Sequence, residues 1–151
     1  TGFKNRTYTK VKAPITFESP APYDKKPTPT LVIRNKGKAW ENPFVVVFEP
    51  YNSSEKPSIQ SVIKLEQDGV YKGLKIISKT PNKDIVQYVI TQSKNQVYKN
   101  KDIYFEGTYA VITLDKNEKL KSIYVGEGKK IIYKNEEITT DSSQKYFKSY
   151  E

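Results

Sequence analysis

The sequence contains no cysteine, no histidine and no methionine. The lack of cysteine excludes disulfide bonds, thiolate nucleophiles and zinc sites built on thiolates. The lack of histidine removes the commonest general base and metal ligand at neutral pH, and it excludes a Ser-His-Asp triad. No run of alternating Asp and Asn residues offers an all-oxygen calcium site. We therefore expect no metal, no cofactor and no catalytic activity from this chain by itself.

Long hydrophobic runs are also missing from the 151 residues. The longest, Phe44 to Phe48, is far shorter than the roughly 18 residues that a membrane-spanning helix requires, so we expect no membrane span. The length corresponds to one ordinary domain. Because the chain begins at Thr1 and holds no methionine, we expect a processed product or a piece of a longer protein, with any export signal upstream.

Arginine is scarce, with only Arg6 and Arg34 beside 24 lysines. The net charge of +9 is uneven, since residues 1–40 hold nine basic and only two acidic side chains. Proteins that read nucleic acids depend on arginine for bidentate contacts to phosphate and guanine, so nucleic acid is not an expected partner. Two interpretations of the charge remain, a solvated lysine-rich surface and the binding of a polyanion.

Short β-branched and aromatic segments dominate the rest of the chain. Residues 59–65 alternate apolar and polar side chains, as in a half-buried strand, whereas 44–49 is a continuous apolar run typical of a strand buried on both faces. Eight of the nine prolines precede residue 58, and residues 1–29 are expected to form an extended, proline-rich lead-in or linker. The expected strands are 12–17, 31–35, 44–49, 59–65, 70–78, 85–91, 103–106, 109–114, 120–125, 130–133 and 137–140.

Turn-forming residues separate these strands. Asp68-Gly69, 115–118 and 126–128 contain the Gly, Asn and Asp residues that favour hairpin turns. Short strands at this spacing, without any helical period, predict an all-β fold. We expect an antiparallel β-sandwich or two-layered β-sheet domain over residues 30–151. The tail, 141–151, is expected either as a docked last strand or as a frayed end.

Carboxylates and tyrosines are the remaining candidates for acid–base chemistry. Glu136 and Glu137 are adjacent, so in a strand they point to opposite faces and cannot share a substrate. Five tyrosines within expected strands are interpreted as half-buried core residues with their hydroxyls at the rim. They are Tyr88, Tyr104, Tyr109, Tyr124 and Tyr133. An enzyme that works by tyrosine chemistry alone is the less favoured alternative.

The segment 30–51 holds the candidate binding residues. It consists of a short strand, a basic loop, the only tryptophan and the apolar run. In one interpretation, Trp40 is a platform for a sugar ring, and Arg34, Lys36 and Lys38 pair with carboxylate or sulfate groups of the ligand. In the other, Trp40 closes one end of the sandwich and the lysines are solvated.

This segment resembles the C-terminal β-domain of heparinase II/III-like, or alginate-lyase-like, polysaccharide lyases. The resemblance covers about residues 20–135 and is a pattern of β-domain residues rather than an active-site signature. The residues that carry it are Leu31-Val32-Ile33-Arg34, Gly37, Ala39-Trp40, Pro43-Phe44-Val45, Phe48-Glu49-Pro50-Tyr51, 59–65, Gly69, Lys75-Ile76, Phe105-Glu106-Gly107, Tyr109-Ala110-Val111, Ile123-Tyr124-Val125-Gly126 and Gly128.

The resemblance implies a periplasmic or extracellular bacterial protein of several domains that cleaves uronic-acid polysaccharides by β-elimination. It implies that this chain is the non-catalytic C-terminal β-domain, which buttresses catalytic domains that lie elsewhere in the polypeptide. The expected partners are those upstream domains and an anionic polysaccharide. A free-standing carbohydrate-binding or surface adhesion module is the alternative.

Overall fold

The computed structural model describes residues 7–12, 29–34, 38, 41, 43–49, 54, 56–81, 83–93, 96–141 and 145–151, with the backbone alone for the first two ranges. The chain divides into two compact units, Thr1–Phe44 and Val45–Glu151. The expected boundary between a lead-in and a β-domain at residue 30 stays a prediction.

All regular elements of the described residues are strands, which confirms the expected all-β, antiparallel fold. The ten strands are β1 (Thr7–Lys12), β2 (Pro29–Arg34), β3 (Ile59–Gln67), β4 (Val70–Lys79), β5 (Asp84–Thr91), β6 (Val97–Lys99), β7 (Ile103–Asp115), β8 (Leu120–Tyr133), β9 (Glu136–Thr139) and β10 (Tyr146–Ser149).

The first unit contains one antiparallel pair, in which β1 runs beside β2 with Thr7 opposite Arg34 and Lys12 opposite Pro29. Strand β2 corresponds to the strand expected at 31–35. The strand expected at 12–17 overlaps β1 only at Lys12, and its remainder lies outside the described residues.

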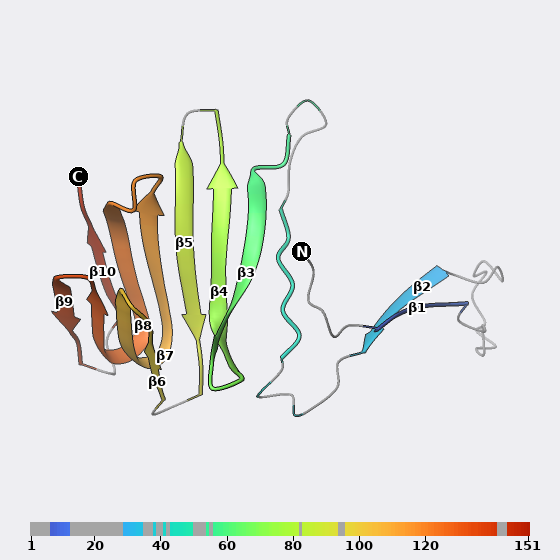
Figure 1. Cartoon of the computed structure of the whole chain (residues 1–151), viewed down its shortest axis with the longest axis horizontal. Coiled ribbons are helices and arrows are strands. Elements are labelled where there is room, and N and C mark those ends of the chain that lie inside the picture. Colours follow the sequence, from blue (N-terminus) through green and yellow to red (C-terminus); the bar gives the residue numbers. More distant parts are fainter. Residues whose placement is uncertain are drawn as a thin grey trace, which may run out of the picture. The chain divides into compact units, whose positions relative to one another are not determined.

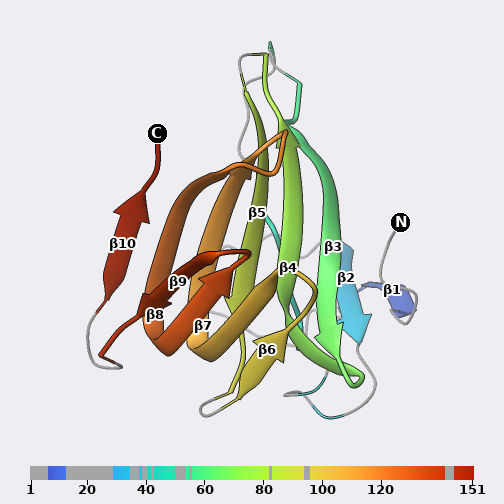
Figure 2. The ribbon, with the colours of Figure 1, turned by 60° about the vertical axis from the view of Figure 1, so that its left-hand side comes forward.

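The second unit is an antiparallel sheet in the order β10-β8-β7-β5-β4-β3, with β6 paired to β7 and β9 paired to β8 (Figure 1). Strands β7 and β8 are the longest, and they curve so that their lower parts, flanked by β6 and β9, fold over the sheet (Figure 2). Strands β7 and β8 thus contribute to both layers. This arrangement lets a chain of modest length enclose a hydrophobic core between the two layers.

The core lies in this fold of β7 and β8. Its fully buried side chains come from both halves of each long strand: Ile103, Phe105, Ala110 and Ile112 from β7, and Ile123, Val125 and Ile131 from β8. Leu65 of β3, Ile90 of β5, Tyr98 of β6 and Ile138 of β9 complete it, together with Leu114 of β7 and Tyr133 of β8. Because side chains alternate between the two faces of a strand, the residues between these positions form a second, outer face of the sheet.

Residues 126–128 are not a turn, contrary to the sequence-based expectation, but lie inside β8. The segments expected as separate strands at 103–106 and 109–114 likewise belong to the single strand β7. Glycines explain both differences, because a Cβ at Gly107 would overlap the Cα of Gly128. The pair lets the two backbones approach closely and bend together, with register shifts around Gly107, instead of reversing the chain.

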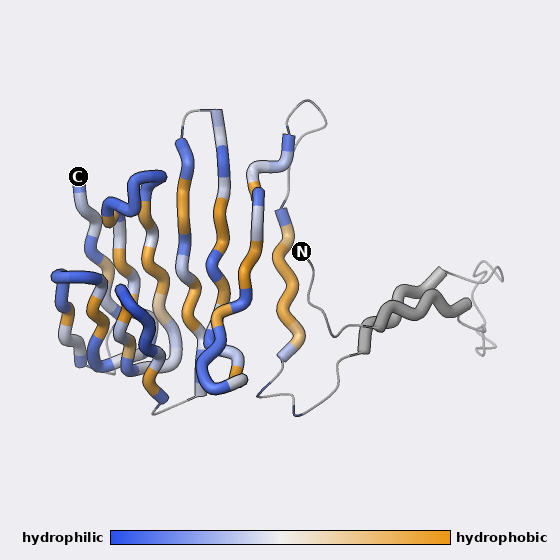
Figure 3. The backbone as a smooth tube through the Cα atoms, viewed as in Figure 1, coloured by the Kyte–Doolittle hydropathy of each residue, from blue (hydrophilic) through white to orange (hydrophobic). Residues whose placement is uncertain are grey.

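The apolar run at 44–49 is not a buried strand, although its continuous hydrophobicity predicts one. Residues 43–49 belong to none of the strands of the described residues, and the exposed fractions of Val46 and Phe48 are 62% and 86%. Figure 3 shows the run as a continuous hydrophobic stretch. Its end is fixed by Glu49, whose carboxylate accepts hydrogen bonds from the amides of Ser58 and Ile59 at the start of β3. A run of hydrophobic residues does not by itself determine whether the segment becomes a strand of the sheet.

The sequence pattern does not predict β6, which is too short to show a period, and it leaves the tail open between a docked strand and a frayed end. The structure selects the docked strand: Tyr146 lies opposite Val125, and Phe147 lies opposite Tyr124. The expected turns at Asp68-Gly69 and 115–118 are confirmed, with Asp68 and Gly69 both at positive φ.

Candidate functional site

Of the four residues expected to bind ligand, only Lys38 has a described side chain. The backbone of Arg34 ends β2, and Lys38 is an exposed side chain that forms an ion pair with Glu41 at 3.2 Å. Lys36 and Trp40 lie outside the described residues. The binding role of this group therefore stays a proposal, and an exposed ion pair such as that of Lys38 contributes little to stability.

The outer face of the sheet carries a cluster of aromatic side chains near the C-terminal edge. Tyr109 of β7, Tyr124 of β8 and Phe147 of β10 lie on three adjacent strands, and we call these three residues the aromatic platform. Phe147 lies directly opposite Tyr124. The rings of Tyr109 and Tyr124 meet edge to face, with their centroids 6.0 Å apart. The exposed fractions of Tyr109 and Phe147 are 39% and 66%, so the platform faces solvent.

A glycine makes room for this cluster. Gly126 follows Tyr124 by two residues on β8, and a Cβ at Gly126 would stand 2.7 Å from Cδ1 of Tyr109 and 3.3 Å from Cε1 of Tyr124. Any side chain at this position would displace the Tyr109 ring. The backbone of Gly126 is therefore the surface against which Tyr109 lies.

Polar side chains surround the platform. Thr91 lies opposite Tyr109, and the Thr108 hydroxyl donates a hydrogen bond to the Glu127 carboxylate at 2.8 Å. The next row across the outer face consists of Gln87, Thr113, Ser122 and Ser149. Lys145 is exposed and immediately precedes β10. Hydroxyl, amide, carboxylate and ammonium groups are thus available at the edges of the aromatic rings.

Three other tyrosines, Tyr88, Tyr98 and Tyr133, pack toward the inner face. Tyr98 and Tyr133 are buried, and Tyr88 packs against the core with the ammonium of Lys75 5.2 Å from its ring centroid. Burial raises the pKa of both Tyr98 and Tyr133. A tyrosine that acts as a general base needs a lowered pKa, so these phenols are poor bases. The half-buried interpretation holds for Tyr88, Tyr104 and Tyr124 but not for the buried Tyr133 or the exposed Tyr109.

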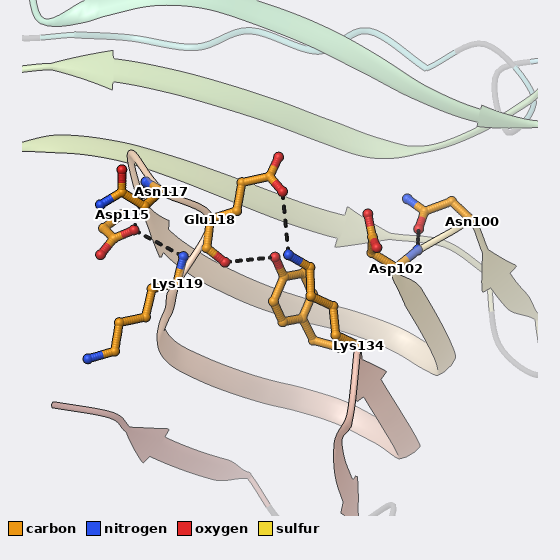
Figure 4. A network of polar contacts seen from close by, with 8 residues as sticks. Asn100, Asp102, Asp115, Asn117, Glu118, Lys119 and Lys134 are labelled. Carbon is orange, nitrogen blue, oxygen red and sulfur yellow. Dashed lines mark hydrogen bonds and ion pairs between the residues drawn. The ribbon is translucent and has the colours of Figure 1, made fainter.

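A polar network links the turns at one end of the sandwich (Figure 4). The carboxylate of Asp115 accepts hydrogen bonds from the amides of Asn117 and Lys119, which closes the β7–β8 turn. The hydroxyl of Tyr133 donates to the carbonyl of Glu118 at 3.1 Å, and Lys134 pairs with the Glu118 carboxylate at 3.4 Å. The polar groups of this network are paired with one another, so we assign it the role of stabilising the turns.

The adjacent carboxylates Glu136 and Glu137 do not form a catalytic pair. Glu136 accepts hydrogen bonds from Lys148 and from the hydroxyl of Tyr150, both at 2.7 Å, whereas Glu137 pairs with Lys130 at 2.6 Å. The Lys148 and Tyr150 hydrogen bonds lower the pKa of Glu136. Burial and the bond to Glu136 raise the pKa of Tyr150 to about 12. Glu136 thus fastens the C-terminal residues to β9.

Two further findings concern the described residues alone. They contain no group of three or more potential metal-ligating side chains. They also contain no helix with the length and hydrophobicity needed to cross a membrane.

The comparison with protein families decides the lineage. Residues 59–150, from the first residue of β3 through β10, match the family described as "Endo-acting ulvan lyase C-terminal domain". The chain belongs to this family. The platform residues all lie within the matched range, whereas Arg34, Lys36, Lys38 and Trp40 precede it.

A curated relative extends the likeness over nearly the whole chain. An endo-acting ulvan lyase of Formosa agariphila is 39% identical over 149 residues, which are 97% of this chain but 18% of the relative. The chain therefore spans less than a fifth of the length of the relative that it matches. No solved structure matches the chain. The resemblance to a polysaccharide-lyase C-terminal domain is confirmed, and the family found is that of the ulvan lyase. The finer resemblance to heparinase II/III-like lyases stays a prediction.

The sequence alone gives little indication of the aromatic platform. Tyr109, Tyr124 and Phe147 are far apart in sequence, and each one fits an ordinary strand or tail residue. Only the register of β7, β8 and β10 places them side by side. Gly126 was the available clue, because a glycine within a strand often marks a close approach.

Proposed function

We propose that this chain is the non-catalytic C-terminal domain of a longer polysaccharide lyase that acts on a uronic-acid polysaccharide of the ulvan type. The observation that carries the proposal is the family match over residues 59–150, together with a relative, named as an endo-acting ulvan lyase, that is more than five times as long as the matched segment. In this proposal the upstream domains perform β-elimination and this domain buttresses them. Heparinase II/III-like catalytic domains and a periplasmic or extracellular location in a bacterium belong to the same proposal.

The chemistry of the described side chains supports a non-catalytic role. The buried tyrosines have raised pKa values, and the carboxylates of Glu136 and Glu137 are engaged by lysines. The exposed apolar side chains of Val46 and Phe48 support a contact with another part of the polypeptide. Contiguous apolar surface of this kind commonly marks an interface.

The test compares the chain alone with the complete polypeptide. β-Elimination creates a carbon–carbon double bond in the uronate ring of the product, which absorbs ultraviolet light. We expect purified ulvan to yield this product with the complete lyase and none with the 151-residue chain. Removal of residues 59–150 from the complete protein should lower its melting temperature if the domain buttresses the catalytic part. Product formation by the chain alone would overturn the non-catalytic assignment.

A carbohydrate-binding module is the second candidate function. The aromatic platform favours it, because exposed rings on a sheet face with polar neighbours are suited to a sugar. The two candidates differ in what they require. A buttress requires contact with the catalytic domains, whereas a binding module must retain glycan in their absence.

A further inference from the structure

We propose that the aromatic platform of Tyr109, Tyr124 and Phe147 is a glycan-binding site on which successive sugar rings of the polysaccharide stack. The identity of the polysaccharide as uronic-acid-containing rests on the proposed function. The site itself rests on the geometry of the outer face. Its residues belong to the second compact unit, whereas residues 34–40 belong to the first.

The exposure of the platform is the first step of the argument. Two thirds of the surface of Phe147 is exposed to solvent, although β10 is paired along its length with β8. The exposure therefore follows from the orientation of the side chain in a paired strand and not from fraying of the chain end. Tyr109 is similarly exposed, while Gly126 gives its ring a flat backbone surface to lie on. Burying such rings against the core would need only a shift of one residue in register. The register of β7, β8 and β10 instead directs all three outward.

The spacing of the rings is the second step. Adjacent strands are about 4.8 Å apart, so β7 and β10 are separated by roughly 10 Å across β8. Rings on these three strands form a row comparable in length to a disaccharide. An extended polysaccharide running across the strands would meet each ring in turn.

The chemistry of the surroundings is the third step. A pyranose ring presents C–H groups on its faces and hydroxyl groups around its edge. The platform supplies aromatic surface for the former, and Thr91, Thr113, Ser122, Gln87 and Glu127 supply donors and acceptors for the latter. A nucleic acid would require a basic groove beside the rings, whereas the residues that surround them are mainly hydroxyl and amide side chains.

Lys145 provides the cation for a uronate carboxylate. It is exposed, it stands two residues before Phe147, and it pairs with no described side chain. A single lysine beside aromatic rings matches a polymer that carries isolated carboxylates between uncharged ring faces.

The experiment measures binding of purified ulvan to the 151-residue chain by isothermal titration calorimetry, with Phe147→Ala and Tyr109→Ala as test variants. Loss of a stacked ring should weaken binding roughly tenfold, by analogy with rings that stack on nucleic-acid bases. Phe48→Ala is the matched control, because Phe48 is an even more exposed phenylalanine outside the platform, and it should bind like the parent. Circular dichroism establishes that each variant is folded.

Three results would overturn the platform. One is equal affinity for the parent, Phe147→Ala and Tyr109→Ala. A second is a loss of affinity confined to Trp40→Ala, which would assign the site to the basic loop. The third is no binding of ulvan by the parent. None of these results bears on whether the complete polypeptide is a lyase, which the product assay decides separately.

Discussion

The ring of Tyr109 occupies the space that a side chain at Gly126 would need, since a Cβ at Gly126 would lie 2.7 Å from its Cδ1 atom. This contact ties the shape of the outer face to a single glycine in β8. It also separates the platform from the bend of β7 and β8, where Gly107 and Gly128 meet backbone to backbone. The two groups of glycines therefore have different consequences when substituted.

The first prediction concerns Gly126→Ala. The added methyl group displaces the Tyr109 ring, which is exposed and free to move, so we expect weaker glycan binding with a small loss of stability. The measurement is the affinity for ulvan beside the near-ultraviolet circular dichroism of the tyrosines. Gly69→Asn is the control, because Gly69 has open space around it and asparagine tolerates its positive φ. Unchanged affinity in Gly126→Ala would show that the position of Tyr109 does not matter for binding.

The second prediction separates buried from exposed phenylalanines. Phe105 is fully buried between the layers, so Phe105→Ala should lower the free energy of unfolding by about 3–5 kcal/mol. Phe147→Ala should change it by no more than about 0.5 kcal/mol, since its side chain is mostly in solvent. Urea denaturation measures both. A large loss of stability in Phe147→Ala would mean that the ring holds β10 in place rather than serving a ligand.

The strands, but not the site, were accessible from the sequence. Alternation at 59–65 predicts β3, and Asp68-Gly69 predicts the turn after it, because both signals are local. The run at 44–49 shows the limit of such signals, since hydrophobicity alone does not specify a pairing partner.

The platform is invisible to local analysis for a related reason. Tyr109 and Tyr124 become neighbours only through the pairing of β7 with β8, and Phe147 joins them only because the tail docks as β10. The glycines at 126 and 128 favour a hairpin when considered by themselves. In the fold, Gly128 lies against Gly107 across the strand pair and Gly126 lies against the ring of Tyr109, and both are contacts between residues far apart in sequence.

The third prediction concerns alkaline pH. Burial and the Glu136 hydrogen bond raise the pKa of Tyr150 to about 12, and burial also raises the pKa of Tyr98 and Tyr133 above the ordinary value of 10. Between the two values the unfolded chain loses protons that the folded chain keeps. Stability contributed by these groups is therefore complete below pH 10 and is lost as the pH rises toward 12.

Denaturation midpoints measured between pH 8 and pH 12 should follow this course, with a decline that begins near pH 10. Tyr150→Phe removes one titrating group and should make the decline shallower. Tyr104→Phe is the comparison, as the substitution of a tyrosine outside this set. A decline of equal steepness in Tyr150→Phe and the parent would show that Tyr150 does not contribute to it.

The fourth prediction uses salt to distinguish the two candidate binding sites. Binding through cations releases counterions, so the logarithm of the affinity falls linearly with the logarithm of the salt concentration. The slope is proportional to the number of ion contacts. The platform has one lysine beside its rings, Lys145, and the logarithm of the affinity should fall with the logarithm of the salt concentration with a slope of about −1. The basic loop, with Arg34, Lys36 and Lys38, would give a slope of about −3. Lys145→Ala should abolish most of the salt dependence while retaining the contribution of the rings, whereas a steep slope that survives this substitution would place the ligand on the loop.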